Sequence, residues 1–216
     1  PPTNTDPATL IPHQNFNTLF IRPTNETEIT NIIRELRSCA PGPDDIPASI
    51  LKESSTHFIR ILTHIINTSF QEGCFPHELK IAKIKPLFKS GEKNSVNNYR
   101  PISLLTAFSK IFEKCMVTRL IDFLTESNIL YEYQFGFRPK HSTNMALHLL
   151  VDKISSSLGA GGAFVGVSLD FRKAFDTIDP KILLEKMYKY GVRGSAHQWF
   201  QSYLQERQQY VCMGTA

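Results

Sequence analysis

Residues 165–176 read VGVSLDFRKAFD, and the alternation at the start of this run is typical of a strand. Successive side chains of a strand point to opposite faces, so the larger apolar residues of the run share one face and the small ones share the other. The sequence therefore predicts a strand over 163–170 with one face packed in the core and one nearly bare face that ends in Asp170. The residues expected in the core are Val165, Val167 and Leu169.

Asp170 is the first candidate for chemistry. A carboxylate at the end of a bare strand face suits a hard-cation ligand at the edge of a surface that a large partner can approach. The alternative is that Asp170 caps the turn that follows the strand, and the run alone leaves both interpretations open. Asp176 lies six residues further on, across a turn, and there a structural hydrogen bond is favoured over metal ligation.

The rest of the chain is richer in helices than in strands. Apolar side chains at helical spacing predict helices over 25–37, 48–70, 106–126, 142–158, 181–190 and around Trp199. Two extended segments within 80–105, joined by a polar turn, predict a hairpin. A further strand is expected over 207–213. Asn25, Ser142 and Asp179 are candidate N-caps. Without regular alternation of strands and helices, the fold class expected is α+β.

Charge and cysteine content narrow the class of protein. The chain of 216 residues has a net charge of +4, but residues 81–140 alone carry 10 basic and 5 acidic side chains. A polyanion would meet this middle region, and the competing interpretation is a solvated basic face. No apolar run is long enough for a transmembrane helix. The four cysteines are far apart, which predicts a reduced, intracellular protein without a disulfide partner.

The run LDFRKAFD at 169–176 resembles motif A of reverse transcriptases, and the surrounding sequence resembles those of non-LTR retrotransposons of the LINE type. Five further blocks resemble that family in the same order: GPDDIP at 42–47, YRPISL at 99–104, KIFEK at 110–114, QFGFR at 134–138, and WF with SYL at 199–204. The resemblance implies a partial right-hand polymerase fold. Its expected parts are a helical extension over 1–80, fingers over 81–158 and a partial palm with motif A over 159–216.

The resemblance also implies a nucleotide site. Asp170 and the main-chain carbonyl of Phe171 would bind two Mg²⁺ ions, which activate the primer 3′-hydroxyl and neutralise charge on the incoming triphosphate. The backbone amides of Lys173 and Ala174 would face that triphosphate. The ring of Phe175 would exclude a ribose 2′-hydroxyl, so that deoxynucleotides are preferred.

The basic middle region would meet the nucleic acid and the phosphates of the nucleotide. Arg100 would hold the incoming phosphates, because a guanidinium is a planar fork of donors. Three lysines would contact nucleic acid: Lys83, Lys85 and Lys89. Arg138 either contacts the template or supports the fold. The implied partners are an RNA template, a DNA primer and deoxynucleoside triphosphates, with no membrane, and the family implies a nuclear location.

One part of the catalytic set is not found in the sequence. Two divalent cations need at least two carboxylates close together, and in this family the second comes from an Ala-Asp-Asp box after motif A. The Asp-Asp pair of this chain, Asp44-Asp45, precedes motif A in a proline-glycine loop. We therefore expect a fragment that ends before motifs B and C. Two functions stay open: a piece of an RNA-directed DNA polymerase, or an inactive nucleic-acid-binding module or transposon remnant.

Overall fold

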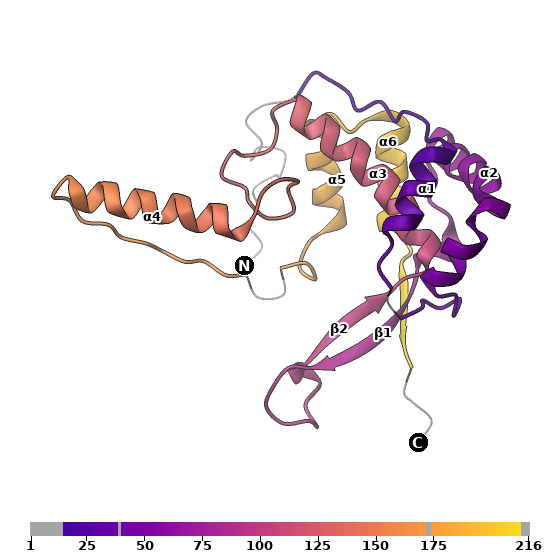
Figure 1. Cartoon of the computed structure of the whole chain (residues 1–216), viewed down its shortest axis with the longest axis horizontal. Coiled ribbons are helices and arrows are strands. Elements are labelled where there is room, and N and C mark those ends of the chain that lie inside the picture. Colours follow the sequence, from indigo (N-terminus) through magenta and orange to yellow (C-terminus); the bar gives the residue numbers. More distant parts are fainter. Residues whose placement is uncertain (1–14, 39, 172–173, 213–216) are drawn as a thin grey trace. The chain divides into compact units, whose positions relative to one another are not determined.

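The computed structural model describes residues 15–38, 40–171 and 174–212, and its elements form two compact units. The first unit contains Pro1–Phe123 and Asp179–Ala216, and the second unit contains Leu124–Ile178. Figure 1 shows the elements in chain order, with helices and strands mixed as the sequence predicts. The division into helical extension, fingers and partial palm concerns functional parts of a polymerase and stays a prediction.

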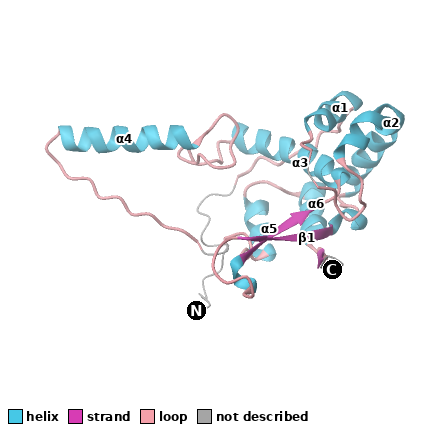
Figure 2. Ribbon diagram, turned by 60° about the horizontal axis from the view of Figure 1, so that its bottom comes forward, coloured by secondary structure: helices cyan, strands magenta, loops and turns pink. Residues whose placement is uncertain are grey.

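The helices confirm the periodic patterns of the sequence. Asn25 caps the first helix, since its side-chain oxygen accepts the N–H of Glu28 at 2.8 Å. Asp179 caps another, accepting the N–H of Lys181 at 2.8 Å, with Pro180 in the first turn. The helices, cyan in Figure 2, are α1 Glu26–Glu35, α2 Ala48–Glu72, α3 Ala107–Glu126, α4 Thr143–Gly159, α5 Pro180–Lys189 and α6 Gly194–Leu204.

The core of the first unit joins helices that are far apart in sequence. Trp199 of α6 is 1% exposed, and its ring lies 5.3 Å from that of Phe75 at a steep angle and 5.5 Å from that of Tyr203 in a stacked arrangement. The indole N–H donates to the hydroxyl of Ser69 at 3.0 Å, so the polar atom of this buried ring is satisfied. Apolar side chains of α1, α2 and α3 complete the cluster: Ile29, Ile33, Leu51, Ile66, Ile111 and Phe112.

One arginine is buried beside this core. Arg119 of α3 is 2% exposed, and it donates to both carboxylate oxygens of Glu28 at 2.8 and 3.0 Å. Its other donors reach the carbonyls of Arg22 at 2.6 Å, Pro23 at 3.0 Å and Cys115 at 2.7 Å. A buried charge is tolerated when it is paired and hydrogen-bonded in this way. Arg119 therefore ties the segment before α1, α1 itself and α3 together.

The small sheet has the order β2-β1-β3. Strand β1, Ile81–Phe88, pairs antiparallel with β2, Tyr99–Leu104, as the predicted hairpin requires. Strand β3, Gln208–Val211, pairs with β1 in parallel, so that Ile84 lies opposite Val211. Short 3₁₀ turns precede β1 and β2, at His77–Lys80 and Val96–Asn98. The strand near the end of the sequence is confirmed, and its partner is a finding of the structure.

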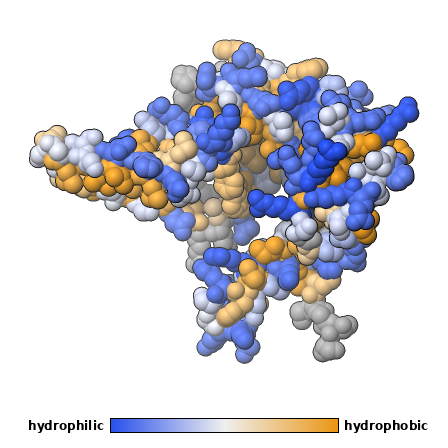
Figure 3. All heavy atoms as spheres, in the orientation of Figure 1, coloured by the Kyte–Doolittle hydropathy of each residue, from blue (hydrophilic) through white to orange (hydrophobic). Residues whose placement is uncertain are grey.

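The second unit contains α4 and long loops. The predicted cap is confirmed, because the hydroxyl of Ser142 accepts the N–H of Met145 at 3.3 Å. No residue of α4 is buried, and Figure 3 shows apolar side chains along its visible face. The exposed apolar residues of α4 are Met145, Leu147, Leu150, Val151 and Leu158.

The strand predicted over 163–170 is wrong: the segment is extended but has no strand assignment. The residues expected in the core are exposed, with Val167 at 80% and Leu169 at 82%. A strand is stable only when its backbone groups pair with a neighbour, and the strand pairs found among the described residues all involve β1. Alternating side chains favour an extended backbone but do not provide a partner.

Two further features of the described residues concern membrane spans and disulfides. No helix in the described part of the chain combines the length and the apolar character needed to cross a membrane. The three described cysteines, Cys74, Cys115 and Cys212, carry free thiols.

Candidate nucleotide and nucleic-acid interface

The hairpin brings three of the predicted basic residues onto one face. Lys83 and Lys85 lie two positions apart in β1 and therefore point to the same side of the sheet. The register places Lys85 opposite Ile102 and Leu87 opposite Arg100, so Arg100 of β2 joins that side. Residues of β1 on the other side, Ala82 and Ile84, are buried in the core. The hairpin thus presents a cationic face to solvent, on which Leu87 and Ile102 are also exposed.

The tip of the hairpin is held by its own hydrogen bonds. The backbone N–H of Lys89 donates to the carbonyl of Asn98 at 2.8 Å, and the side chain of Asn98 donates to the carbonyl of Glu92 at 2.9 Å. The hydroxyl of Tyr99 donates to the carbonyl of Lys93 at 2.9 Å. These bonds order a turn whose lysine side chains stay exposed, so the positive charge is carried on a structured tip.

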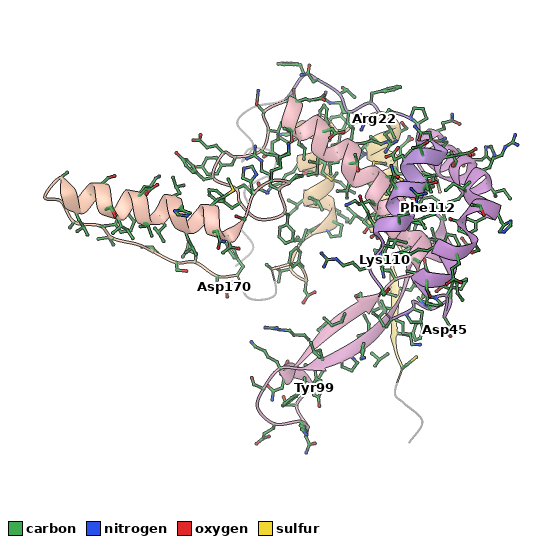
Figure 4. All side chains as sticks on the ribbon, in the orientation of Figure 1. Arg22, Asp45, Tyr99, Lys110, Phe112 and Asp170 are labelled. Carbon is green, nitrogen blue, oxygen red and sulfur yellow. The ribbon has the colours of Figure 1, made fainter. Side chains whose placement is uncertain are left out.

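Lys83 differs from the other cations because it faces a carboxylate. Its ammonium lies 3.5 Å from the carboxylate of Asp45, whose charge is the main cause of the raised pKa of Lys83. Asp45 has a φ of +52° in the loop before α2, and Figure 4 labels it beside the base of the sheet. A Cβ on Gly42 of the same loop would lie 2.5 Å from the backbone nitrogen of Thr106, so only glycine permits this close packing. The Asp44-Asp45 pair therefore belongs to a loop that supports the hairpin.

Asp170 lies on the exposed extended segment of the second unit (Figure 4). Among the described residues it has no hydrogen bond or ion pair, and no group of three metal-ligating side chains forms in that part of the chain. Two Mg²⁺ ions require more than one carboxylate. Asp170 and the carbonyl of Phe171, which is the predicted ligand set, therefore do not make a two-metal site by themselves. Their part in metal binding stays a prediction.

The turn after Asp170 carries the remaining predicted nucleotide contacts. The hydroxyl of Thr177 donates to the carbonyl of Ala174 at 3.3 Å, so among the described residues this turn is closed by Thr177 rather than by Asp176. Lys173 lies outside the described residues. Phe175 is 75% exposed, and its only described ring neighbour is Phe137, at 6.0 Å and 88° between planes.

The loop with the QFGFR block makes two contacts, and the sequence did not predict the second. Arg138 donates to the carbonyl of Tyr131 at 3.1 Å, which supports the loop, while a contact with template stays a prediction. Phe137 meets Phe175 across a long sequence separation, although the sequence interpretation used Phe137 only as part of a block. Its positive φ of +58° has no signal in the sequence, because the residue is not glycine or asparagine.

Comparison with known proteins finds similar sequences over most of the chain. Residues 89–215 match the family described as reverse transcriptase (RNA-dependent DNA polymerase). The chain is 34% identical over 197 residues to a Drosophila melanogaster protein named "Probable RNA-directed DNA polymerase from transposon BS". That alignment covers 88% of this chain and 21% of the Drosophila protein. It is 31% identical over 153 residues to the "RNA-directed DNA polymerase from mobile element jockey" of the same species, covering 70% of this chain and 17% of that protein. The chain thus spans about a fifth of the length of these relatives.

Proposed function

Because the chain belongs to the reverse transcriptase family, we propose that it is a piece of the RNA-directed DNA polymerase of a non-LTR retrotransposon. The family match over residues 89–215 carries this proposal, since it includes both Arg100 and Asp170. In the complete enzyme the product would be DNA copied from an RNA template. The partners would be that template, a DNA primer and deoxynucleoside triphosphates, and the expected nuclear location is part of the same proposal.

The cationic face of the hairpin is the part of the chain that would hold phosphates. Lys85 and Arg100 lie on this face, and Lys89 lies at its tip. Among the described residues none of the three has an acidic partner, whereas Lys83 is engaged by Asp45. Lysine and arginine side chains on phosphates release counterions from nucleic acid, which makes binding strongly dependent on salt. We therefore assign phosphate binding to Lys85, Lys89 and Arg100 ahead of Lys83.

Salt dependence tests this assignment. Each neutralised phosphate contributes roughly −0.7 to −0.9 to the slope of log K against log salt, so three contacts give a slope of about −2 to −3. The double variant Lys85→Ala/Lys89→Ala should flatten that slope by about 1.4 to 1.8. The matched control Lys52→Ala/Arg60→Ala removes the same charge from the exposed side of α2 and should leave the slope unchanged. Equal slopes for both double variants would contradict the assignment.

Phe175 has a proposed role in choosing the sugar. Its exposed ring is free to stand against C2′ of an incoming nucleotide, where a 2′-hydroxyl would collide with it. In the complete polymerase, Phe175→Val should raise the ratio of ribonucleotide to deoxynucleotide incorporation. The ratio is informative because loss of folded protein cancels from it. An unchanged ratio would mean that Phe175 does not select the sugar.

A second candidate function is nucleic-acid binding without catalysis. It is favoured because no group of three or more His, Cys, Asp or Glu side chains that could hold a metal ion forms among the described residues. We expect the 216-residue chain to give no template-dependent primer extension above an Asp170→Ala control. Extension that exceeds the control would exclude the second candidate, while saturable binding without extension would favour it for this chain.

A further inference from the structure

We propose that the second unit binds an unpaired stretch of nucleic acid by stacking a base on Phe137. This inference rests on the proposed function but concerns a separate surface. The bound strand is the single-stranded part of a template, because the bases inside a duplex already have both faces covered. Single-strand-binding proteins commonly combine aromatic platforms of this kind with nearby basic side chains.

The conformation of Phe137 is the first observation. Its φ of +58° is a left-handed backbone conformation that bulky residues adopt rarely and at a cost of about 1–3 kcal/mol. Packing does not offset this cost, because the residue is 88% exposed. A strained backbone that holds an apolar ring in water is therefore not explained by the stability of the loop. It is the arrangement expected when the ring is kept ready for a partner.

The neighbouring rings form the second observation. Phe137 and Phe175 meet at 88° with centroids 6.0 Å apart, an edge-to-face contact that leaves most ring faces open. Tyr131 and Tyr133 form another steep pair at 5.4 Å in the same loop, and the ammonium of Lys153 lies 4.7 Å from the ring centre of Tyr133. Exposed rings gathered in one unit offer flat apolar faces of the kind that nucleobases stack on.

The loop is also held in place before any partner arrives. The N–H of Gln134 donates to the carbonyl of Tyr131 at 3.0 Å, and the guanidinium of Arg138 donates to the same carbonyl at 3.1 Å. The N–H of His141 donates to the carbonyl of Arg138 at 3.3 Å. These bonds bracket Phe137 on both sides. Less conformational freedom is then lost on binding, which is how preorganisation increases affinity.

Charge decides which flat ligand this surface suits. Arg138 and the exposed Lys140 follow Phe137 closely in the sequence, Lys153 lies over Tyr133, and Glu132 is the one acid within residues 131–141. Cations beside stacking rings fit a ligand with aromatic bases and a phosphate backbone. A second copy of this chain, which has a net charge of +4, offers these cations no phosphate backbone.

The test compares oligonucleotides of one sequence as single-stranded RNA, single-stranded DNA and duplex, with the 216-residue chain. Stacking on one aromatic ring is worth about 1–3 kcal/mol, so Phe137→Ala should weaken single-strand binding by about 5- to 160-fold and spare duplex binding. Phe137→Tyr should restore it. The control Phe16→Ala removes a ring that is 90% exposed in the first unit and should change nothing. Equal losses for single strand and duplex, or a loss below about twofold, would overturn the proposal.

A second readout separates stacking from the hairpin. Phe137→Ala should shift affinity without changing the salt slope, whereas the Lys85→Ala/Lys89→Ala pair changes the slope, so either proposal can fail alone. A bound single strand should quench the fluorescence of the indole introduced by Phe137→Trp, while the fluorescence of the buried Trp199 is a constant background. If Phe137→Ala instead turns a self-associating chain into a monomer with unchanged oligonucleotide affinity, the surface is a contact between copies and the proposal is wrong.

Discussion

Replacing Arg119 by methionine removes the guanidinium that joins the segment before α1, α1 and α3. Methionine keeps the length and apolar volume of the aliphatic part of the side chain, but it also removes the guanidinium from Phe70, whose ring centre lies 5.3 Å from the guanidinium carbon. The change therefore removes the hydrogen bonds, the ion pair and this cation–π contact together. The Glu28 carboxylate and the backbone carbonyls that accept from Arg119 lose their partner.

The expected loss of unfolding free energy is large for a single substitution. Removing one partner of a buried ion pair costs about 3–5 kcal/mol, because it leaves an uncompensated group behind. Glu28 keeps 26% side-chain exposure and can recover some water, so we expect the lower end, about 3 kcal/mol. The matched control is Arg22→Met, which breaks a 2.7 Å bridge to Asp122 whose two side chains are about half exposed, and it should cost about 0–1 kcal/mol.

Urea unfolding followed by circular dichroism measures both variants. The midpoint should fall for Arg119→Met while the slope of free energy against urea stays unchanged. A loss no greater than that of Arg22→Met would refute the reasoning, because it would mean that water replaces the contacts of Arg119 at no cost.

The same contact sets a dependence on pH. Burial is the largest influence on Glu28 and acts to raise its pKa, but hydrogen bonds from Arg119 and Thr24 and the charges of Arg119 and Arg22 together lower it below 4.5. A carboxylate with a lowered folded-state pKa stabilises the fold above its unfolded pKa, and this contribution is lost as pH falls through the folded value. Arg119→Met should therefore flatten the fall in stability below pH 4.5.

Two further predictions concern a thiol and a glycine. Burial raises the pKa of Cys115 to about 11, so iodoacetamide at pH 8 should label the exposed Cys74 in the native protein and label Cys115 only after unfolding, as peptide mass mapping would show; rapid native labelling of both thiols would contradict this. Gly191 has a φ of +105°, and a Cβ there would collide with the carbonyl oxygen of Asn17, so Gly191→Ala should lower the free energy of unfolding in urea by about 2 kcal/mol or more. The control Gly159→Ala, with open space around its Cβ, should not lower it.

Local signals in the sequence predicted the helices well. Asn25 and Asp179 cap helices because a cap needs only a side-chain oxygen within a few residues of the free N–H groups. The hairpin was also predictable, since its strands are joined by the polar loop 89–98. These elements depend on residues that are close in sequence, so one sequence is enough to predict them.

Contacts between distant segments were not predictable in the same way. The parallel pairing of β3 with β1 and the burial of Arg119 against Glu28 depend on which segments meet in space. The strand expected over 163–170 failed for this reason, because alternation describes a face and not a partner. Arginine is also usually exposed, so nothing in the composition marked Arg119 as a buried side chain.

The candidate site shows the same limit. Motif resemblance predicted roles for Asp170, Phe175 and Arg100, because each lies in a short continuous run. It could not show that Asp45 engages Lys83, or that Phe137 meets Phe175, because these pairs join separate runs. Residue type suggests a chemical role, whereas only the fold shows which groups are already occupied.

The position of Trp199 has a consequence for synthesis on the ribosome. Its ring fills the core beside Phe70 and Phe75, which are made much earlier, and the whole of Leu124–Ile178 is translated between them. Until α6 emerges, those early aromatic side chains lack the cover that Trp199 provides, and incomplete chains with exposed apolar surface are prone to aggregate. We therefore expect incomplete chains that lack α6 to aggregate more readily than the whole 216-residue sequence, unless a chaperone shields these side chains.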